Sequence, residues 1–337
     1  MTREDRTILR FSHIILDPGK QRALREAVSA DLDWQYILKV CQEEQICCLA
    51  YHHLKSLDLE QCVPNVIRES FRSIYYEVCA RNTLIMSRAR NLLQILQEER
   101  LPVILLKGIF LANYVYPGIG CRPMVDIDIL VQEKDRSRLG DILGEFGYSF
   151  IGKGRTDKNP FEYAWTFEAA DKTRQPLTVD VHFNLLTASW LMGLCRRKVD
   201  LERIWSKAMP LQFDGIDSRG LSPEHLLIFL SCHSFTHDHQ RLIRLVDIEG
   251  VLQAFKGKLD LEEAQNEAKR FGLDNILKET LERVEKLAKG NDRAAGLLKE
   301  RYPGISSIRY VVTRPGLFER IRALIRLVRV FLRIRSG

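Results

Sequence analysis

The central part of the chain constrains the fold most, because there the spacing of apolar residues changes from a helical to a strand period. Residues 102–106 (PVILL) form a continuous apolar run before a Lys-Gly pair, which indicates a buried strand ending in a tight turn. Residues 124–131 (MVDIDILV) alternate between apolar and acidic side chains, as a strand does. Two further strand-like runs, 163–168 and 177–184, flank a polar stretch that suits a hairpin loop. Together these runs predict a small mixed β-sheet.

Helical periodicity dominates on both sides of these strands and between them. Apolar residues recur at intervals of three and four before residue 98, and the pattern returns at Ser222, where a Ser-Pro pair opens a helix. We therefore expect an α+β protein, with a mixed-sheet core flanked by N- and C-terminal helical regions. The predicted parts are a helical N-terminal region (1–98), the core (99–215), a helical C-terminal region (216–312) and a basic amphipathic tail (313–337).

Composition and cysteine spacing indicate the cellular compartment of the chain. No uncharged apolar run is long enough for a spanning helix, and the acidic N-terminus does not resemble a secretory signal. The eight cysteines form no Cys-x-x-Cys pair, which indicates reduced, buried thiols. We therefore expect a cytoplasmic protein.

Net charge is concentrated at the C-terminal end. Residues 314–337 hold seven arginines and one glutamate, which accounts for six of the seven net positive charges. The rest of the chain is nearly neutral, which argues against a long nucleic-acid groove in the body.

The tail has the pattern of an amphipathic helix. Four arginines spaced by four, three and four residues form one stripe, opposite a broad apolar face; they are Arg322, Arg326, Arg329 and Arg333. Such a helix can lie in a membrane interface as a peripheral anchor, bind a protein partner, or pack on the body of the chain. The sequence leaves these alternatives open.

Three aspartates form the strongest chemical pattern. Asp126 and Asp128 alternate on one predicted strand, so both project from the same face, while Val125, Ile127 and Ile129 are expected to point into the core. Two such close carboxylates repel each other unless a cation lies between them, and Mg²⁺ prefers oxygen ligands together with substrate phosphates. Asp180, on a later predicted strand, completes a three-carboxylate cluster if the two strands are neighbours. In a two-metal arrangement it would bind the ion that activates the attacking group, or accept that group's proton.

Four other residues are candidates for binding the nucleotide. Lys107 and Gly108 end a strand and open a helix, where glycine allows close approach and free N–H groups can face phosphate. Lys107 and Arg122 are the basic side chains most plausibly directed at a triphosphate. His182 shares a strand face with Asp180, so three roles stay open: it touches substrate, it orients the acid, or it is a structural histidine.

The strings LLKGIFLANYVYP, CRPMVDIDILV and LTVDVHFNL resemble the nucleotidyltransferases of the DNA polymerase β superfamily, and most closely a bacterial branch with Lys-Gly, Asp-x-Asp and Asp-x-His motifs. The resemblance implies a mixed-sheet fold, Mg²⁺ or Mn²⁺, and transfer of a nucleoside monophosphate from an NTP to an acceptor, with release of pyrophosphate. It implies that Asp126, Asp128 and Asp180 bind the metal and that Gly108 forms the phosphate turn.

The acceptor stays open between a small molecule such as a sugar or antibiotic, a peptide or protein side chain, and an RNA end. The alternative function, from another class, is a non-catalytic NTP-binding or scaffold protein that retains the fold.

A histidine-rich segment invites a competing metal-site hypothesis. His233 and His237 stand four residues apart, so a helix would place both on one face. No third ligand or H-E-x-x-H motif accompanies them, and we therefore interpret this segment as a helix that packs on the core.

Overall fold

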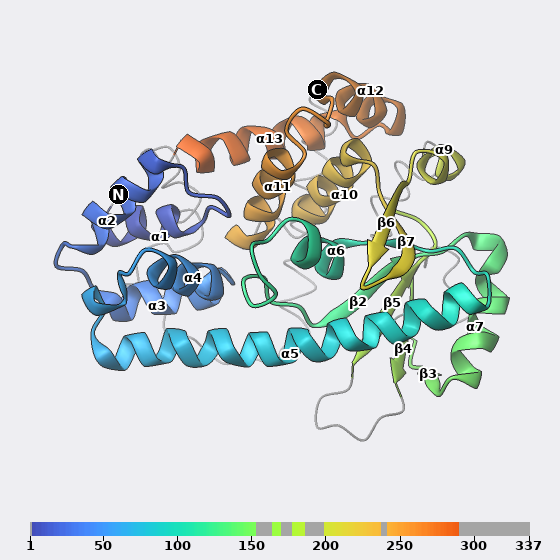
Figure 1. The fold of residues 1–337 in the computed structure, drawn as a ribbon. Helices are drawn as coiled ribbons and strands as arrows, with labels where there is room; N and C mark the ends of the chain where they lie inside the picture. Colours follow the sequence, from blue (N-terminus) through green and yellow to red (C-terminus); the bar gives the residue numbers. More distant parts are fainter. Residues whose placement is uncertain (1, 153–163, 170–176, 186–198, 237–240, 290–337) are drawn as a thin grey trace, which may run out of the picture.

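The structure is a computed structural model that describes residues 2–152, 164–169, 177–185, 199–236 and 241–289. A group of N-terminal helices lies at one end and the β-sheet at the other, and the long helix α5 (Asn65–Glu98) runs beneath both (Figure 1). Because α5 contributes to both packing regions, the buried apolar residues form one continuous core.

The N-terminal helices begin where the sequence offers capping groups. They are α1 (Arg3–Phe11), α2 (Pro18–Val28), α3 (Trp34–Glu43) and α4 (Cys47–Ser56), followed by the short 3-10 helix η1 (Glu60–Cys62). Thr2 caps α1 in a capping box with Asp5, and Asp17 caps α2 ahead of a proline at the first position. This arrangement bears out the helical pattern expected for the first 98 residues.

The sheet has seven strands among the described residues, in the order β3-β4-β5-β2-β1-β7-β6. The strands are β1 (Ile104–Leu105), β2 (Asp126–Leu130), β3 (Tyr148–Phe150), β4 (Ala164–Ala169), β5 (Thr178–His182), β6 (Met209–Phe213) and β7 (Ile216–Gly220). β2 pairs with β5 and β1 with β7 in parallel, and the other pairs are antiparallel. The expected α+β fold with a mixed sheet is therefore confirmed.

Four short helical segments connect these strands: α6 (Lys107–Tyr114), η2 (Glu133–Asp135), α7 (Arg136–Glu145) and α9 (Leu201–Ser206). The expected core edge at residue 215 falls in the turn of the β6–β7 hairpin, where Asp214 and Gly215 both have positive φ. β7 lies beyond this edge, yet it joins the sheet by pairing with β1.

One core assignment from the sequence was wrong. Val125 was expected to be buried beside Ile127 and Ile129, but it is 65% exposed. The reason is that β2 begins at Asp126, so Val125 belongs to the preceding loop, whereas Ile127 and Ile129 are fully buried.

The C-terminal helices pack beside α6 and the sheet (Figure 1). They are α10 (Pro223–Thr236), α11 (Leu242–Ala254), α12 (Leu261–Phe271) and α13 (Asp274–Lys289). α12 ends at Gly272, whose φ of 67° is accessible to glycine at little steric cost. α10 is buried nearly all round, as expected for a helix with neighbours on several sides.

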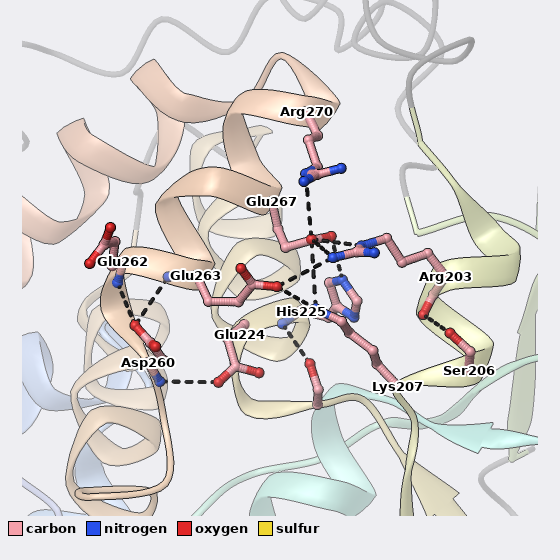
Figure 2. A network of polar contacts seen from close by, with 11 residues as sticks. Arg203, Ser206, Lys207, Glu224, His225, Asp260, Glu262, Glu263, Glu267 and Arg270 are labelled. Atoms are coloured by element: carbon pink, nitrogen blue, oxygen red, sulfur yellow. Dashed lines mark hydrogen bonds and ion pairs between the residues drawn. The ribbon is translucent and has the colours of Figure 1, made fainter.

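A buried polar network ties α9, α10 and α12 together (Figure 2). The carboxylate of Glu267 is fully buried, and it accepts a 2.7 Å hydrogen bond from Arg203 Nε. His225 Nε2 lies 3.2 Å from the other oxygen of Glu267. Lys207 and Arg203 also contact Glu263. Glu267 and Glu263 therefore each face at least one cation.

Within the described ranges, no helix is both long and apolar enough to cross a membrane. The seven cysteines in those ranges are free thiols, and most are buried, as expected. Cys195 and the basic tail (313–337) lie outside the described residues.

Candidate functional site

The structure brings the three predicted aspartates together. β2 and β5 are parallel neighbours, and their register sets Asp128 directly beside Asp180. Asp126 lies two residues before Asp128 on the same face of β2. One carboxylate oxygen from each of the three lies within 4.8 Å of the others. The spacing is suitable for a single cation to contact all three side chains.

Asp128 is the best supported of the three acids. It is 2% exposed, and its Oδ1 atom lies 2.7 Å from Lys107 Nζ and 2.9 Å from His182 Nε2. Both partners act on the same carboxylate oxygen, which leaves Oδ2 for another ligand.

The electrostatic surroundings separate Asp126 from Asp128. Burial and the neighbouring Asp128 carboxylate raise the pKa of Asp126 to about 6. Burial would also raise the pKa of Asp128, but Lys107 and the hydrogen bond from His182 lower it well below its usual range. The pKa values of these two neighbouring carboxyls are therefore shifted in opposite directions.

Thr166 on β4 supports the third acid and was not anticipated from the sequence. It pairs with Asp180 across the antiparallel β4–β5 ladder, and its hydroxyl donates a 2.8 Å hydrogen bond to Asp180 Oδ1. Thr166 is 2% exposed, so this contact is shielded from water. A threonine in a strand is common, and only the strand register reveals that this one faces an acid.

Lys107 is directed at Asp128 by the turn between β1 and α6. The Leu106 N–H donates to the Asp128 carbonyl at 3.0 Å, which holds the turn against β2. Lys107 is the first residue of α6, and its φ of 31° is unusual for a residue with a side chain. This strained conformation fixes the start of the lysine side chain beside the acids.

Gly108 follows in a packed position. A β-carbon there would lie 3.4 Å from Arg122 Nη1 and 3.5 Å from Met124, both ordinary contacts. The Arg122 side chain of this chain therefore lies close over the predicted phosphate turn.

Arg122 is held by an acid from the C-terminal helices. Its Nε and Nη2 atoms donate to the two oxygens of Asp247 on α11 at 2.8 and 2.9 Å, and Tyr116 donates to the same carboxylate at 2.8 Å. Arg122 and Tyr116 therefore reach Asp247 across the core. Only the tertiary fold brings these residues together.

The loop that carries Arg122 is also tied to α5. Asn82 is fully buried, and its amide donates to the carbonyls of Ile119 and Arg122 at 2.5 and 2.8 Å. Its carbonyl oxygen accepts from the Met124 N–H at 3.3 Å. Both helical regions therefore position the segment that leads into β2.

His182 lies in the acidic cluster, as expected from its place on the strand. Its ring contacts Asp128 rather than Asp180, and its buried Nδ1 atom has no hydrogen-bond partner among the residues that the structure describes. The ring also meets Phe229 of α10 edge-on, at a centroid distance of 6.4 Å. α10 therefore forms part of the wall of the site.

The second histidine pattern is only partly within the described residues. His233 lies on α10, which packs against α11 and α13 and meets the core where Phe229 contacts His182 of β5. His237 lies outside the described residues.

The residues of the acidic cluster fit a hard divalent ion. Three carboxylates face one lysine, so the cluster carries excess negative charge in a largely buried position. Such an excess is costly unless a cation compensates for it, and carboxylate oxygens are the ligands that Mg²⁺ and Mn²⁺ prefer.

Comparison with a protein-family model points the same way. A family model described as an uncharacterised nucleotidyltransferase matches residues 30–289. A search of curated proteins found no match. One similar solved structure is an antigenic nucleotidyltransferase-like protein from Paracoccidioides brasiliensis, with 15% identity, a TM-score of 0.37, and coverage of 58% of this chain and 91% of that one.

Another is the antibiotic-resistance factor ANT(2'')-Ia, with 14% identity, a TM-score of 0.33, and coverage of 66% of this chain and all of that one. The family match spans both helical flanks and the sheet that carries the three aspartates. The chain belongs to this family of nucleotidyltransferases.

Proposed function

We propose that this protein transfers a nucleoside monophosphate from an NTP to an acceptor and releases pyrophosphate, in a reaction that depends on Mg²⁺ or Mn²⁺. The observation that carries the proposal is the in-register placement of Asp128 beside Asp180 on parallel strands, with Asp126 on the same face. Family membership supplies the reaction class, and the acidic cluster supplies a place for the ion that this reaction class needs.

Each site residue then has a defined task. Asp126, Asp128 and Asp180 would hold the ion, which neutralises the charge of the triphosphate when bound. The start of α6 at Gly108 presents backbone N–H groups suited to phosphate. Arg122, placed over this turn by Asp247, adds positive charge there.

The chemistry is a displacement at phosphorus. An acceptor oxygen forms a bond to the α-phosphorus while the bond to the leaving pyrophosphate oxygen breaks, and the acceptor proton is released to solvent water. Thr166 holds one oxygen of Asp180, which leaves the other to bind the ion. His182 positions Asp128, since it contacts the same oxygen as Lys107.

The acceptor belongs to one of three classes: a small molecule, a peptide or protein side chain, or an RNA end. The helical flanks would form one wall of the acceptor site, and the contact of Phe229 on α10 with His182 supports this for the C-terminal flank. The near-neutral charge of the chain outside the tail favours an acceptor smaller than a long nucleic acid.

The test is transfer of label from the four α-labelled NTPs, with Mg²⁺ or Mn²⁺ and a cell extract as the source of acceptor. The Asp126→Ala/Asp128→Ala double variant removes the site, and Asp141→Ala removes an exposed carboxylate on α7 as a matched control. We expect wild type and Asp141→Ala to label an extract component and the double variant to label none. Metal-dependent NTP binding without transfer would instead favour a non-catalytic NTP-binding or scaffold protein.

A further inference from the structure

The arrangement of donors around Asp128 bears on how many ions the acidic site accepts. Lys107 Nζ and His182 Nε2 both contact Asp128 Oδ1, at 2.7 and 2.9 Å. Both are shielded, since the side chain of Lys107 is 17% exposed and that of His182 is 4% exposed. This oxygen is therefore occupied by groups of the protein itself.

The third acid is restricted in the same way. Asp180 Oδ1 accepts the hydroxyl of Thr166 at 2.8 Å, so Asp128 and Asp180 each offer one unoccupied oxygen. One ion can use one oxygen from each of the three aspartates. A second ion that shared both acids of β2 with the first would need another oxygen of Asp128, the one that Lys107 and His182 hold.

The net charge of the acidic cluster also indicates a single divalent ion. Three carboxylates and the ammonium of Lys107 leave an excess of two negative charges, which one divalent ion balances. The backbone and a neighbouring ring also fix the position of Lys107. Its φ is 31°, and its ammonium lies 5.9 Å from the centre of the Phe229 ring.

We infer that Lys107 is the resident cation of this site: its ammonium occupies the position on Asp128 that a second divalent ion would need, so the site takes a single ion. The inference rests on the proposed function. It adds the specific statement that a lysine does the work of one of the two cations in a two-metal arrangement.

Manganese spectroscopy tests the inference without reference to turnover. The metal-free full chain is titrated with Mn²⁺ in the presence of inorganic tripolyphosphate, which supplies a triphosphate without a nucleobase. Two Mn²⁺ ions about 4 Å apart are spin-coupled, whereas a single ion gives an isolated six-line electron paramagnetic resonance spectrum.

We expect an isolated ion and one Mn²⁺ per chain in wild type, and a coupled pair with two Mn²⁺ per chain in Lys107→Met. Lys107→Arg keeps the positive charge and should bind one ion. Lys256→Met, which removes an exposed lysine after α11, is the matched control and should also bind one. If Lys107→Met fails to fold, Lys107→Gln removes the same charge and is expected to give the same coupled pair, and an isolated ion in that variant would overturn the inference.

Two outcomes would overturn the inference alone: a coupled pair in wild type, or an isolated ion in a folded Lys107→Met protein. The first would show that Asp128 accepts a second ion beside Lys107, and the second would show that something else excludes it. The absence of any saturable Mn²⁺ site would instead remove the proposed function, and this inference with it.

Discussion

Two clusters of buried acids in this molecule differ in how their charge is balanced. In the network of Figure 2, Glu267 faces Arg203 and His225 directly, with Lys207 and Arg270 within 4 Å. In the acidic cluster of β2 and β5, three carboxylates share the single ammonium of Lys107. Cationic side chains of the protein balance the negative charge of the first cluster. The second cluster keeps an excess of negative charge that a bound cation can balance.

The pKa shifts express the same difference. Burial would raise the pKa of Glu267, but hydrogen bonds from Arg203 and His225 lower it to about 2. Burial and Asp128 raise the pKa of Asp126 to about 6, and Lys107 only partly offsets this. The Glu267 cluster, whose charges are balanced, thus stabilises the fold without a bound ion. In the aspartate cluster the carboxylates repel one another, and a bound cation would reduce this repulsion.

The largest expected effect is the loss of the site in Asp128→Asn. This change removes the central negative charge of the cluster and leaves Lys107 without its partner. We expect nucleotidyl transfer to fall by about 10³-fold and Mn²⁺ binding to weaken strongly, measured by label transfer and by Mn²⁺ titration. Binding of Mn²⁺ and NTP with wild-type affinity in this variant would contradict the assignment of the ion site to the acidic cluster of β2 and β5.

The matching change in the balanced cluster is Glu267→Gln. It removes the buried charge shared by Arg203 and His225, and we expect the free energy of unfolding to fall by about 2 kcal/mol. Urea unfolding measures this loss, and Mn²⁺ titration of the folded variant should give the wild-type affinity. A Glu267→Gln protein that is as stable as wild type but does not bind Mn²⁺ would show that the Glu267 cluster serves ion binding rather than stability.

A smaller effect is expected from Thr166→Val, which keeps the shape of the side chain and removes the hydroxyl that holds Asp180. We expect Mn²⁺ affinity to fall by about tenfold, as for other groups that orient a metal ligand. Thr166→Ser keeps the hydroxyl and should bind Mn²⁺ as wild type does. Equal affinity in the valine and serine variants would show that Thr166 has only a packing role.

The smallest effect is a dependence of stability on pH. Because the pKa of Glu267 is lowered from 4.5 to about 2 on folding, its charge stabilises the fold above pH 4.5 and loses this effect as the pH falls towards 2. The difference in unfolding free energy between wild type and Glu267→Gln should therefore shrink between pH 4.5 and pH 2, measured by urea unfolding across that range. A difference that is constant over this range would show that Glu267 acts through packing alone.

Sequence alone was sufficient for the local parts of the site. The period of apolar residues predicted β2 and β5, and the alternation within β2 placed Asp126 and Asp128 on one face. Likewise, the Lys-Gly pair predicted the turn that opens α6. These are properties of short segments, in which neighbouring residues decide the backbone geometry.

Contacts between distant segments could not be predicted in this way. The hydrogen bonds between Arg122 and Asp247 and between Thr166 and Asp180 correspond to no local sequence pattern. They depend on helix packing and on strand register. β6 and β7 were also missed, since the alternation in β7 is carried partly by small residues such as Ser218 and Gly220. Val125 was misplaced by a single residue at the start of β2.

The central claim is that the acids of β2 and β5 form a divalent-ion site for a triphosphate. Its most direct test is anomalous X-ray diffraction from crystals of the full chain grown with Mn²⁺ and tripolyphosphate. We predict one anomalous peak in contact with Asp126, Asp128 and Asp180, with the phosphates close to Gly108 and Arg122. A site that stays empty at saturating Mn²⁺, or a peak bound away from these three carboxylates, would contradict the claim.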